Sequence, residues 1–161
     1  MKQLDAESTA LVARILAGAS DLTLATLRAD GSPHASTVNF VHQGLNLYAA
    51  ISIDSGKAHD IGHDSRVALT VNLPYINWSA IQGLAIDGRA AFVADRQELI
   101  TVGALLRKKQ PAFEKMIADP DVLPWPGMLF LRITPRALAL LDYTKGYGHT
   151  SYFDLGADTG S

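Results

Sequence analysis

Three β-type segments joined only by short turns, residues 22–27, 35–41 and 45–53, constrain the fold more than any other feature. The turns contain residues that favour hairpins, among them Gly31 and Gly44. Strands joined by turns this short must be antiparallel, because a parallel connection needs a crossover of a dozen or more residues. The sequence therefore predicts an antiparallel, mainly β (α+β) fold without βαβ units.

Later segments extend this pattern to about seven strands and three or four helices. Strand alternation returns at residues 67–73, 83–93, 128–133 and 137–141. Helical signals occupy residues 4–19, 55–64, 95–109 and 111–117. Asp95 is the expected N-cap of the third helix, and Gly88 inside a strand predicts a bulge.

We expect a single domain over residues 1–161, with its first helix within residues 1–20. Residues 143–161 lack apolar periodicity and are expected to form a mobile C-terminal tail.

Composition excludes several classes of function. The 161 residues include 14 basic and 16 acidic residues, for a net charge of -2, and no cysteine. A nucleic-acid partner is not expected, because such binding needs a basic surface. Without thiols, any redox role requires a bound cofactor. Charged residues interrupt the N-terminus and polar residues interrupt the long uncharged stretches, so we expect no signal peptide, no membrane span and a cytoplasmic location.

The segment between the third strand and the second helix predicts a phosphate site. It reads Asp54-Ser55-Gly56-Lys57-Ala58 and leads directly into the helix. A helix N-terminus offers free N–H groups and a partial positive charge to an anion, and a lysine adds a full charge. The alternative is an ordinary N-cap followed by a solvated lysine.

Other polar residues are expected to converge on this place. Ser36 and Thr37 lie on the second strand, which is expected to pair with the third strand in a hairpin. Their hydroxyls would then face the place that Ser52 and Lys57 reach. Gln82, close to Trp78 before a later strand, suits hydrogen bonding to the edge of a heterocycle. The alternative for Gln82 is a solvated loop residue.

Four segments in order carry a family resemblance. They read LATLRADGSPHASTVNFV, GLNLYAAISIDSGKAHDI, DSRVALTVN and IQGLAIDGRAAFV. In this order they resemble the FMN-binding split-barrel family related to pyridoxamine 5'-phosphate oxidase. The resemblance covers roughly residues 21–93. It implies a six-stranded antiparallel split β-barrel with Greek-key topology and flanking helices, and a homodimer that holds FMN at its subunit interface.

The resemblance also implies residue roles. The second-strand segment that holds the flavin is matched by Ser36, Thr37 and Val38. Ser52 lies near the end of the strand that lines the isoalloxazine ring.

In the same way, Ser55 and Lys57 match the segment that grips the phosphate, and Gln82 matches a glutamine that touches the ring. The chain departs from the oxidase at two cationic positions, where it has Gly56 and Val41. We therefore expect an FMN-dependent oxidoreductase whose substrate is another, unidentified small molecule.

Alternative functions remain open. His59 and His63 have the spacing of a metal pair, but Asp60 replaces the glutamate of the zinc motif and no third ligand is evident, so no metal is expected. Relatives with this barrel use haem, for which His149 is a candidate ligand, or a deazaflavin. A non-catalytic flavin module is a further alternative, because no general acid or base stands out.

Two aromatic positions after the barrel segments, Trp125 and Tyr147, are candidates for closing over the flavin of the neighbouring subunit.

Overall fold

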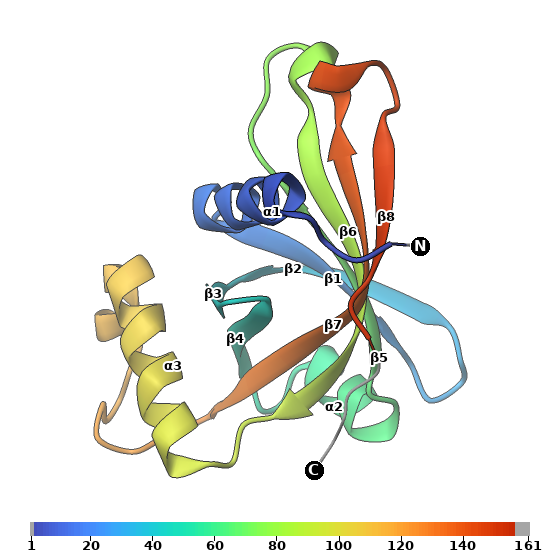
Figure 1. Cartoon of the computed structure of the whole chain (residues 1–161). Coiled ribbons are helices and arrows are strands. Elements are labelled where there is room, and N and C mark those ends of the chain that lie inside the picture. Colours follow the sequence, from blue (N-terminus) through green and yellow to red (C-terminus); the bar gives the residue numbers. More distant parts are fainter. Residues whose placement is uncertain (1, 157–161) are drawn as a thin grey trace.

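The computed structural model describes residues 2–156. Within them, eight strands form one antiparallel sheet that curls into a half-barrel, consistent with a split barrel (Figure 1). The strand order is β2-β1-β5-β6-β7-β4-β3, and β8 pairs with β7 outside this path. The strands are β1 Asp21–Leu27, β2 Pro33–Asn39, β3 Val41–Gln43, β4 Asn46–Ser52, β5 Arg66–Asn72, β6 Gln82–Phe92, β7 Met128–Asp142 and β8 Thr150–Asp154.

The predicted first hairpin is present. The second hairpin is formed by β3 and β4, so β2 pairs with β1 and, against expectation, not with β4. β1 and β2 pair along their whole length across a turn in which Gly31 has a φ of 83°, a value that glycine adopts without strain. The segment expected as one strand, residues 35–41, is divided into β2 and β3 at Phe40, whose side chain is 1% exposed in the core.

Three α-helices flank the sheet: α1 Ala6–Gly18, α2 Gly56–His63 and α3 Arg96–Lys109. Each begins at a residue whose side chain accepts a hydrogen bond from a first-turn N–H, namely Asp5, Ser55 and Asp95. The predicted Asp95 cap is thus confirmed. No helix within the described residues combines the length and the apolar character that crossing a membrane requires.

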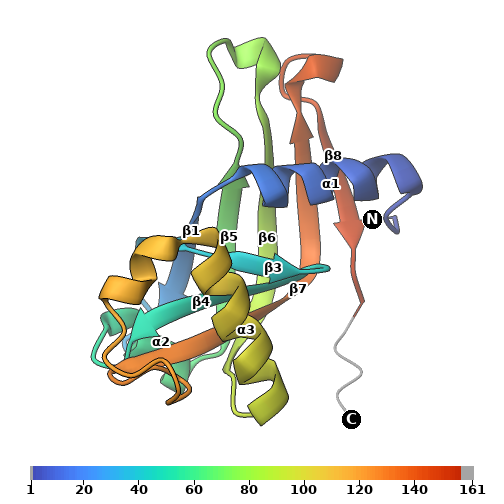
Figure 2. The ribbon, with the colours of Figure 1, turned by 90° about the vertical axis from the view of Figure 1, so that its left-hand side faces the viewer.

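Two hydrophobic clusters hold the fold together. The larger one fills the inner face of the curled sheet and includes the buried side of α1, where Val12 and Ile15 are fully buried. The smaller cluster lies between α3 and the β3–β4 side of the sheet and contains Trp125 and Phe130. Figure 2 shows α1 and α3 over different parts of the sheet.

The C-terminal third differs most from expectation. The two strands predicted at residues 128–133 and 137–141 are one 15-residue strand, β7. The predicted bulge at Gly88 is confirmed by a register shift in the β6–β7 pairing. A Cβ at Gly88 would lie 2.7 Å from the Thr134 carbonyl oxygen, so the close strand approach requires glycine.

The prediction of a mobile tail is wrong for residues 150–154, which form β8 against β7. Phe153 anchors this strand because its side chain is completely buried in the larger cluster. Residues 157–161 lie outside the described part of the chain. Together, β3 and β8 raise the number of strands from the expected six to eight.

Candidate functional site

The start of α2 collects polar groups at one end of the half-barrel. The Ser55 hydroxyl accepts a hydrogen bond from the Ala58 N–H (3.2 Å) and donates one to the Ser52 carbonyl oxygen (2.8 Å). The N–H groups of Gly56 and Lys57, at the first two helical positions, have no partner inside the helix. The helix therefore presents two donors and its positive end at this point.

Lys57 adds a positive charge in the first turn of α2. Its side chain is half-buried, and its ammonium forms no ion pair with any residue between 2 and 156. Ser55 is thus hydrogen bonded to Ser52, and Lys57 follows in the first turn of α2, while the role of these three residues in holding a phosphate stays a prediction.

An open pocket of about 540 Å³ lies beside this helix start. Asp54 is the single anionic residue among those that line it, and the rest of the lining is neutral or titratable. The lining residues are Ile53, Asp54, Ser55, Gly56, Ala58, His59, Phe92 and Leu129. The pocket therefore joins the polar helix start to an apolar wall.

The three predicted residues of β2 do not share one face. Ser36 is half-buried and shares the inner face of the strand with His34, whereas Thr37 is exposed on the outer face opposite Thr23. The Val38 side chain is 7% exposed within the larger core cluster, so only its backbone can meet a ligand. β2 is an edge strand, so the backbone N–H and C=O groups on its free side are accessible to a ligand.

Gln82 lies at the other end of the sheet. It begins β6, whereas Phe92, which lines the pocket beside α2, ends this 11-residue strand. A strand of this length separates its ends by about 33 Å. One flavin cannot contact both Gln82 and the α2 start of the same chain.

The side-chain amide of Gln82 is hydrogen bonded within the chain. Its Nε2 donates to Asp142 Oδ1 (3.0 Å), and its Oε1 accepts from Arg14 Nη2 (3.0 Å). Burial raises the pKa of Asp142, but hydrogen bonds from Thr144 and Gln82 outweigh burial and hold that pKa below its ordinary value. Gln82 therefore stabilises a buried carboxylate.

A buried polar network beside α2 was missed by sequence reasoning. Asp60 is 4% exposed and accepts hydrogen bonds from the Thr26 hydroxyl (2.7 Å) and from His34 Nδ1 (3.0 Å). These residues come from α2, β1 and β2, so no local motif contains them. A carboxylate on the buried face of α2 would have signalled a required partner, but the helix is too short for its faces to be assigned from sequence.

The structure accounts for one departure from the oxidase. The side chain of Val41, where a cation was expected from the resemblance, is 4% exposed and packs in the smaller cluster with Tyr48 and Phe130. A charged side chain in this conformation would enter an apolar interface. This position therefore serves packing in this chain.

Trp125 cannot cover a neighbouring flavin, and that expectation is wrong. Its side chain is 1% exposed, packs at a tilt against Phe113 and meets Phe130 edge to face beneath α3. Tyr147 is instead highly exposed and lies 6.1 Å from Trp78 between ring centroids. Both occupy the projecting hairpins at the Gln82 end of the sheet (Figure 1).

His59 and His63 meet edge to face, with ring centroids 4.8 Å apart. Across residues 2–156, no group of three or more histidine or acidic side chains is placed to hold a metal ion. His149, the candidate haem ligand, is exposed in the turn between β7 and β8.

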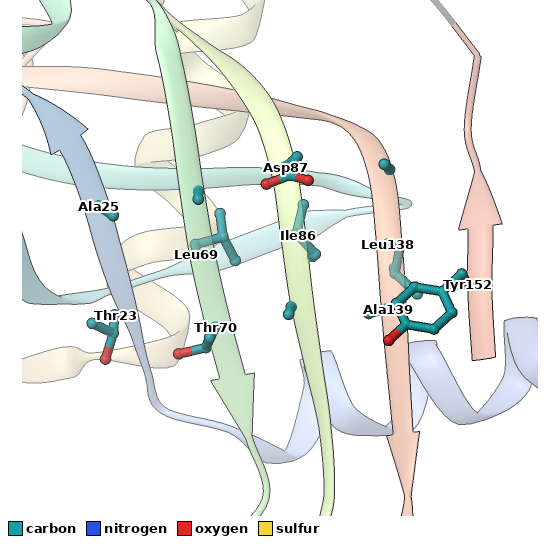
Figure 3. Close-up of a pocket in the computed structure, with 12 residues that line it drawn as sticks. Thr23, Ala25, Leu69, Thr70, Ile86, Asp87, Leu138, Ala139 and Tyr152 are labelled. Atoms are coloured by element: carbon teal, nitrogen blue, oxygen red, sulfur yellow. The ribbon is translucent and has the colours of Figure 1, made fainter. Parts of the chain in front are cut away.

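The outer face of the sheet carries small side chains and a shallow groove of about 320 Å³ (Figure 3). The cross-strand register aligns Thr23, Thr70, Ala85, Ala139 and Tyr152 in one row. Such side chains leave a face flat enough for another surface to approach closely.

Comparison with known proteins identifies the family. The model of the pyridoxamine 5'-phosphate oxidase family matches residues 9–138. No curated protein sequence matches this chain.

Several solved structures share the fold. The haem-binding protein from Mycobacterium smegmatis has a TM-score of 0.76 and 19% identity, over 96% of this chain and 60% of that one. This chain therefore spans less than two thirds of that relative. A conserved hypothetical protein from Mycobacterium tuberculosis has a TM-score of 0.73 and 23% identity, over 99% and 100% of the two chains. The haem storage protein HutZ from Vibrio cholerae has a TM-score of 0.65 and 19% identity, over 83% and 91%.

The family match spans most of the chain, and the curled antiparallel sheet agrees with it. The chain therefore belongs to the pyridoxamine 5'-phosphate oxidase family.

Proposed function

We propose that this chain binds FMN as a homodimeric split barrel and acts as a flavin-dependent oxidoreductase on a small molecule. The observation that carries the proposal is the start of α2, where the N–H groups of Gly56 and Lys57 have no partner inside the helix and Ser55 and Gly56 line an open pocket. The Lys57 ammonium, which forms no ion pair within residues 2–156, belongs to the same helical turn. Membership of the pyridoxamine 5'-phosphate oxidase family supports a flavin as the ligand of this site.

The residues present fit a flavin phosphate. The N–H groups of Gly56 and Lys57 and the Lys57 ammonium supply donors without a competing ion pair, while Ser55 is held in place by its capping bonds. The free edge of β2, with Ser36, would orient the isoalloxazine ring. Bound FMN supplies the hydride or electron transfer, and the protein contributes orientation and exclusion of water.

Two observations support the proposed homodimer. The distance between Gln82 and the α2 start requires a second copy if one flavin is to meet both. The outer face offers a surface for that copy, because its alanine and threonine side chains are exposed or half-buried and Asp87 is the one charged residue among the described residues that line the groove. Thr37 belongs to this face, so the β2 edge would lie beside the proposed interface.

The test is a flavin titration of wild-type protein and Lys57→Ala. Loss of a charge-assisted phosphate contact, worth about 1.5–3 kcal/mol, should weaken FMN binding by roughly 10- to 100-fold. Riboflavin, which lacks the phosphate, should bind both proteins equally. Lys115→Ala is the matched control, because Lys115 is exposed on a different element. Equal FMN affinity of wild type and Lys57→Ala would contradict the phosphate site.

Catalysis has its own test. The FMN-loaded protein should be reduced by NADH or NADPH and should then turn over with an electron acceptor. Stoichiometric reduction without turnover across acceptors would favour a non-catalytic flavin module. Preferential binding of a deazaflavin over FMN in the same titration would change the cofactor and leave the site in place.

Haem is the second candidate ligand. Two structural neighbours bind or store haem, and His149 is exposed at the projecting β7–β8 turn. Titration with haem should then give a Soret shift that His149→Ala abolishes. A spectrum unchanged by haem would exclude this alternative.

A further inference from the structure

Asp60 fixes which ring nitrogen of His34 carries hydrogen. The carboxylate is buried and accepts hydrogen bonds from Thr26 and from His34 Nδ1. Burial raises the pKa of Asp60, but the hydrogen bonds from Thr26 and His34 outweigh it and hold that pKa below its ordinary value. Because an ionised carboxylate only accepts, Nδ1 carries hydrogen and donates, and Nε2 on the other side of the ring remains available.

The ring lies against the first residue of α2. A Cβ at Gly56 would be 3.4 Å from His34 Cε1 and 3.8 Å from Nδ1, which are ordinary contact distances, so the imidazole lies directly beside the first residue of α2. The His34 side chain is 28% exposed, in contrast to 5% for Asp60. The ring therefore contacts the helix start and is partly exposed, while Nδ1 is bound to the buried Asp60 carboxylate.

We propose that His34, positioned by Asp60, is a second cationic ligand of the flavin phosphate and makes FMN binding dependent on pH. This inference rests on the proposed FMN site at α2. When His34 is protonated, the site gains one positive charge. When His34 is neutral, the Asp60 carboxylate is left without that compensation close to the phosphate.

The charges around His34 predict the sign of the effect. Lysine and arginine side chains stay protonated where histidines titrate, between about pH 5 and 8, and carboxylates stay ionised. The phosphate gains negative charge as pH rises through about 6, which would strengthen binding to a fixed cation. A decrease of FMN affinity with rising pH therefore requires a titrating histidine. The other ionisable groups on the elements around His34 are Lys57, His59 and His63 on α2, Asp54 before it and Arg28 after β1.

The experiment measures the ratio of FMN affinity to riboflavin affinity between about pH 5.5 and 8.5. For the wild type, the ratio should fall by roughly 10-fold as His34 loses its proton. For His34→Gln, it should stay flat or rise. His42→Gln is the matched control, because His42 lies on β3 and contacts the Gly44 carbonyl oxygen. It should behave as the wild type does, and His59→Gln should still show the fall.

Asp60→Asn tests the positioning role. Removal of the carboxylate destabilises the imidazolium, so the midpoint of the pH dependence should move down by about 1 pH unit. If this variant does not fold, NMR titration of the His34 Cε1–H signal in wild-type protein gives a second measurement. FMN should then raise the pH at which that signal titrates, and riboflavin should not.

The outcomes separate this inference from the proposed function. FMN binding with the same pH dependence in wild type and His34→Gln would overturn the role of His34 and leave the FMN site intact. No preference for FMN over riboflavin at any pH would overturn both.

Discussion

The polar side chains at the two ends of β6 differ in whether they already have ion-pair or hydrogen-bond partners. At the α2 end, Lys57 has no ion pair within the described residues and the first helix N–H groups face outward. At the hairpin end, both atoms of the Gln82 amide are already hydrogen bonded to Arg14 and Asp142. Residue type alone therefore does not show whether a polar group is available to a ligand. In this chain, the α2 end keeps donors without a partner in the described part of the chain, whereas the Gln82 amide keeps only its second N–H and its second lone pair for a ligand.

The largest effect is expected from disrupting the proposed dimer, which would bring the α2 end of one copy close to the Gln82 end of the other. Ala85→Arg places a charge at the centre of the outer face, where an unpaired charge buried at an interface is strongly unfavourable. We expect a monomer in sedimentation velocity, with thermal stability kept and FMN affinity reduced at least about 100-fold, since several kcal/mol of interface energy is lost.

Ala91→Arg is the control, because Ala91 lies on the same strand, is exposed and does not line the groove. A dimer of Ala85→Arg with unchanged FMN affinity would show that the interface is elsewhere.

A smaller effect is expected at the hairpin end. Gln82→Leu removes one donor from the buried Asp142 carboxylate, so the free energy of unfolding should fall by about 1–3 kcal/mol in urea titrations. Affinities for FMN and riboflavin should fall together by about 3- to 10-fold, because Gln82 would meet the ring and not the phosphate. A loss confined to FMN would contradict the assignment of the phosphate to the α2 end.

Lowering the pH should show how much the buried carboxylate at each end of β6 contributes to the free energy of unfolding. The pKa values of Asp60 and Asp142 are both held below the ordinary value in the folded state. Their stabilising contributions are therefore complete above the unfolded value of about 4 and are lost as pH falls through the folded values. The free energy of unfolding should decrease with acid below about pH 4 in the wild type. Asp60→Asn and Asp142→Asn should each decrease less steeply, and parallel slopes in all three proteins would contradict this account.

Local patterns predicted much of the fold. The hairpins, the Asp95 cap and the Gly88 bulge each depend on residues close in sequence. β8 was missed because its single buried anchor, Phe153, gives no periodic signal, and its position depends on pairing with β7. The two strands predicted at residues 128–133 and 137–141 are joined through Pro135, which pairs with Gly88 at the bulge in β6, so the continuity of β7 depends on its partner strand.

The candidate site was predicted in part for the same reason. Ser52, Ser55 and Lys57 lie within one short segment, and the structure keeps them together. The bond between His34 and Asp60 spans three elements, and the separation of Gln82 from α2 follows from the length of β6. Sequence patterns therefore predict neither the contact between His34 and Asp60 nor the separation of Gln82 from α2.

The most direct test of the central claim is a crystal structure of the protein with saturating FMN. We expect a dimer through the outer face, with the phosphate within hydrogen-bonding distance of the Gly56 and Lys57 N–H groups and the Lys57 ammonium, and with Gln82 of the second copy near the ring. A flavin phosphate bound away from α2, or no flavin in the pocket beside it, would contradict the account.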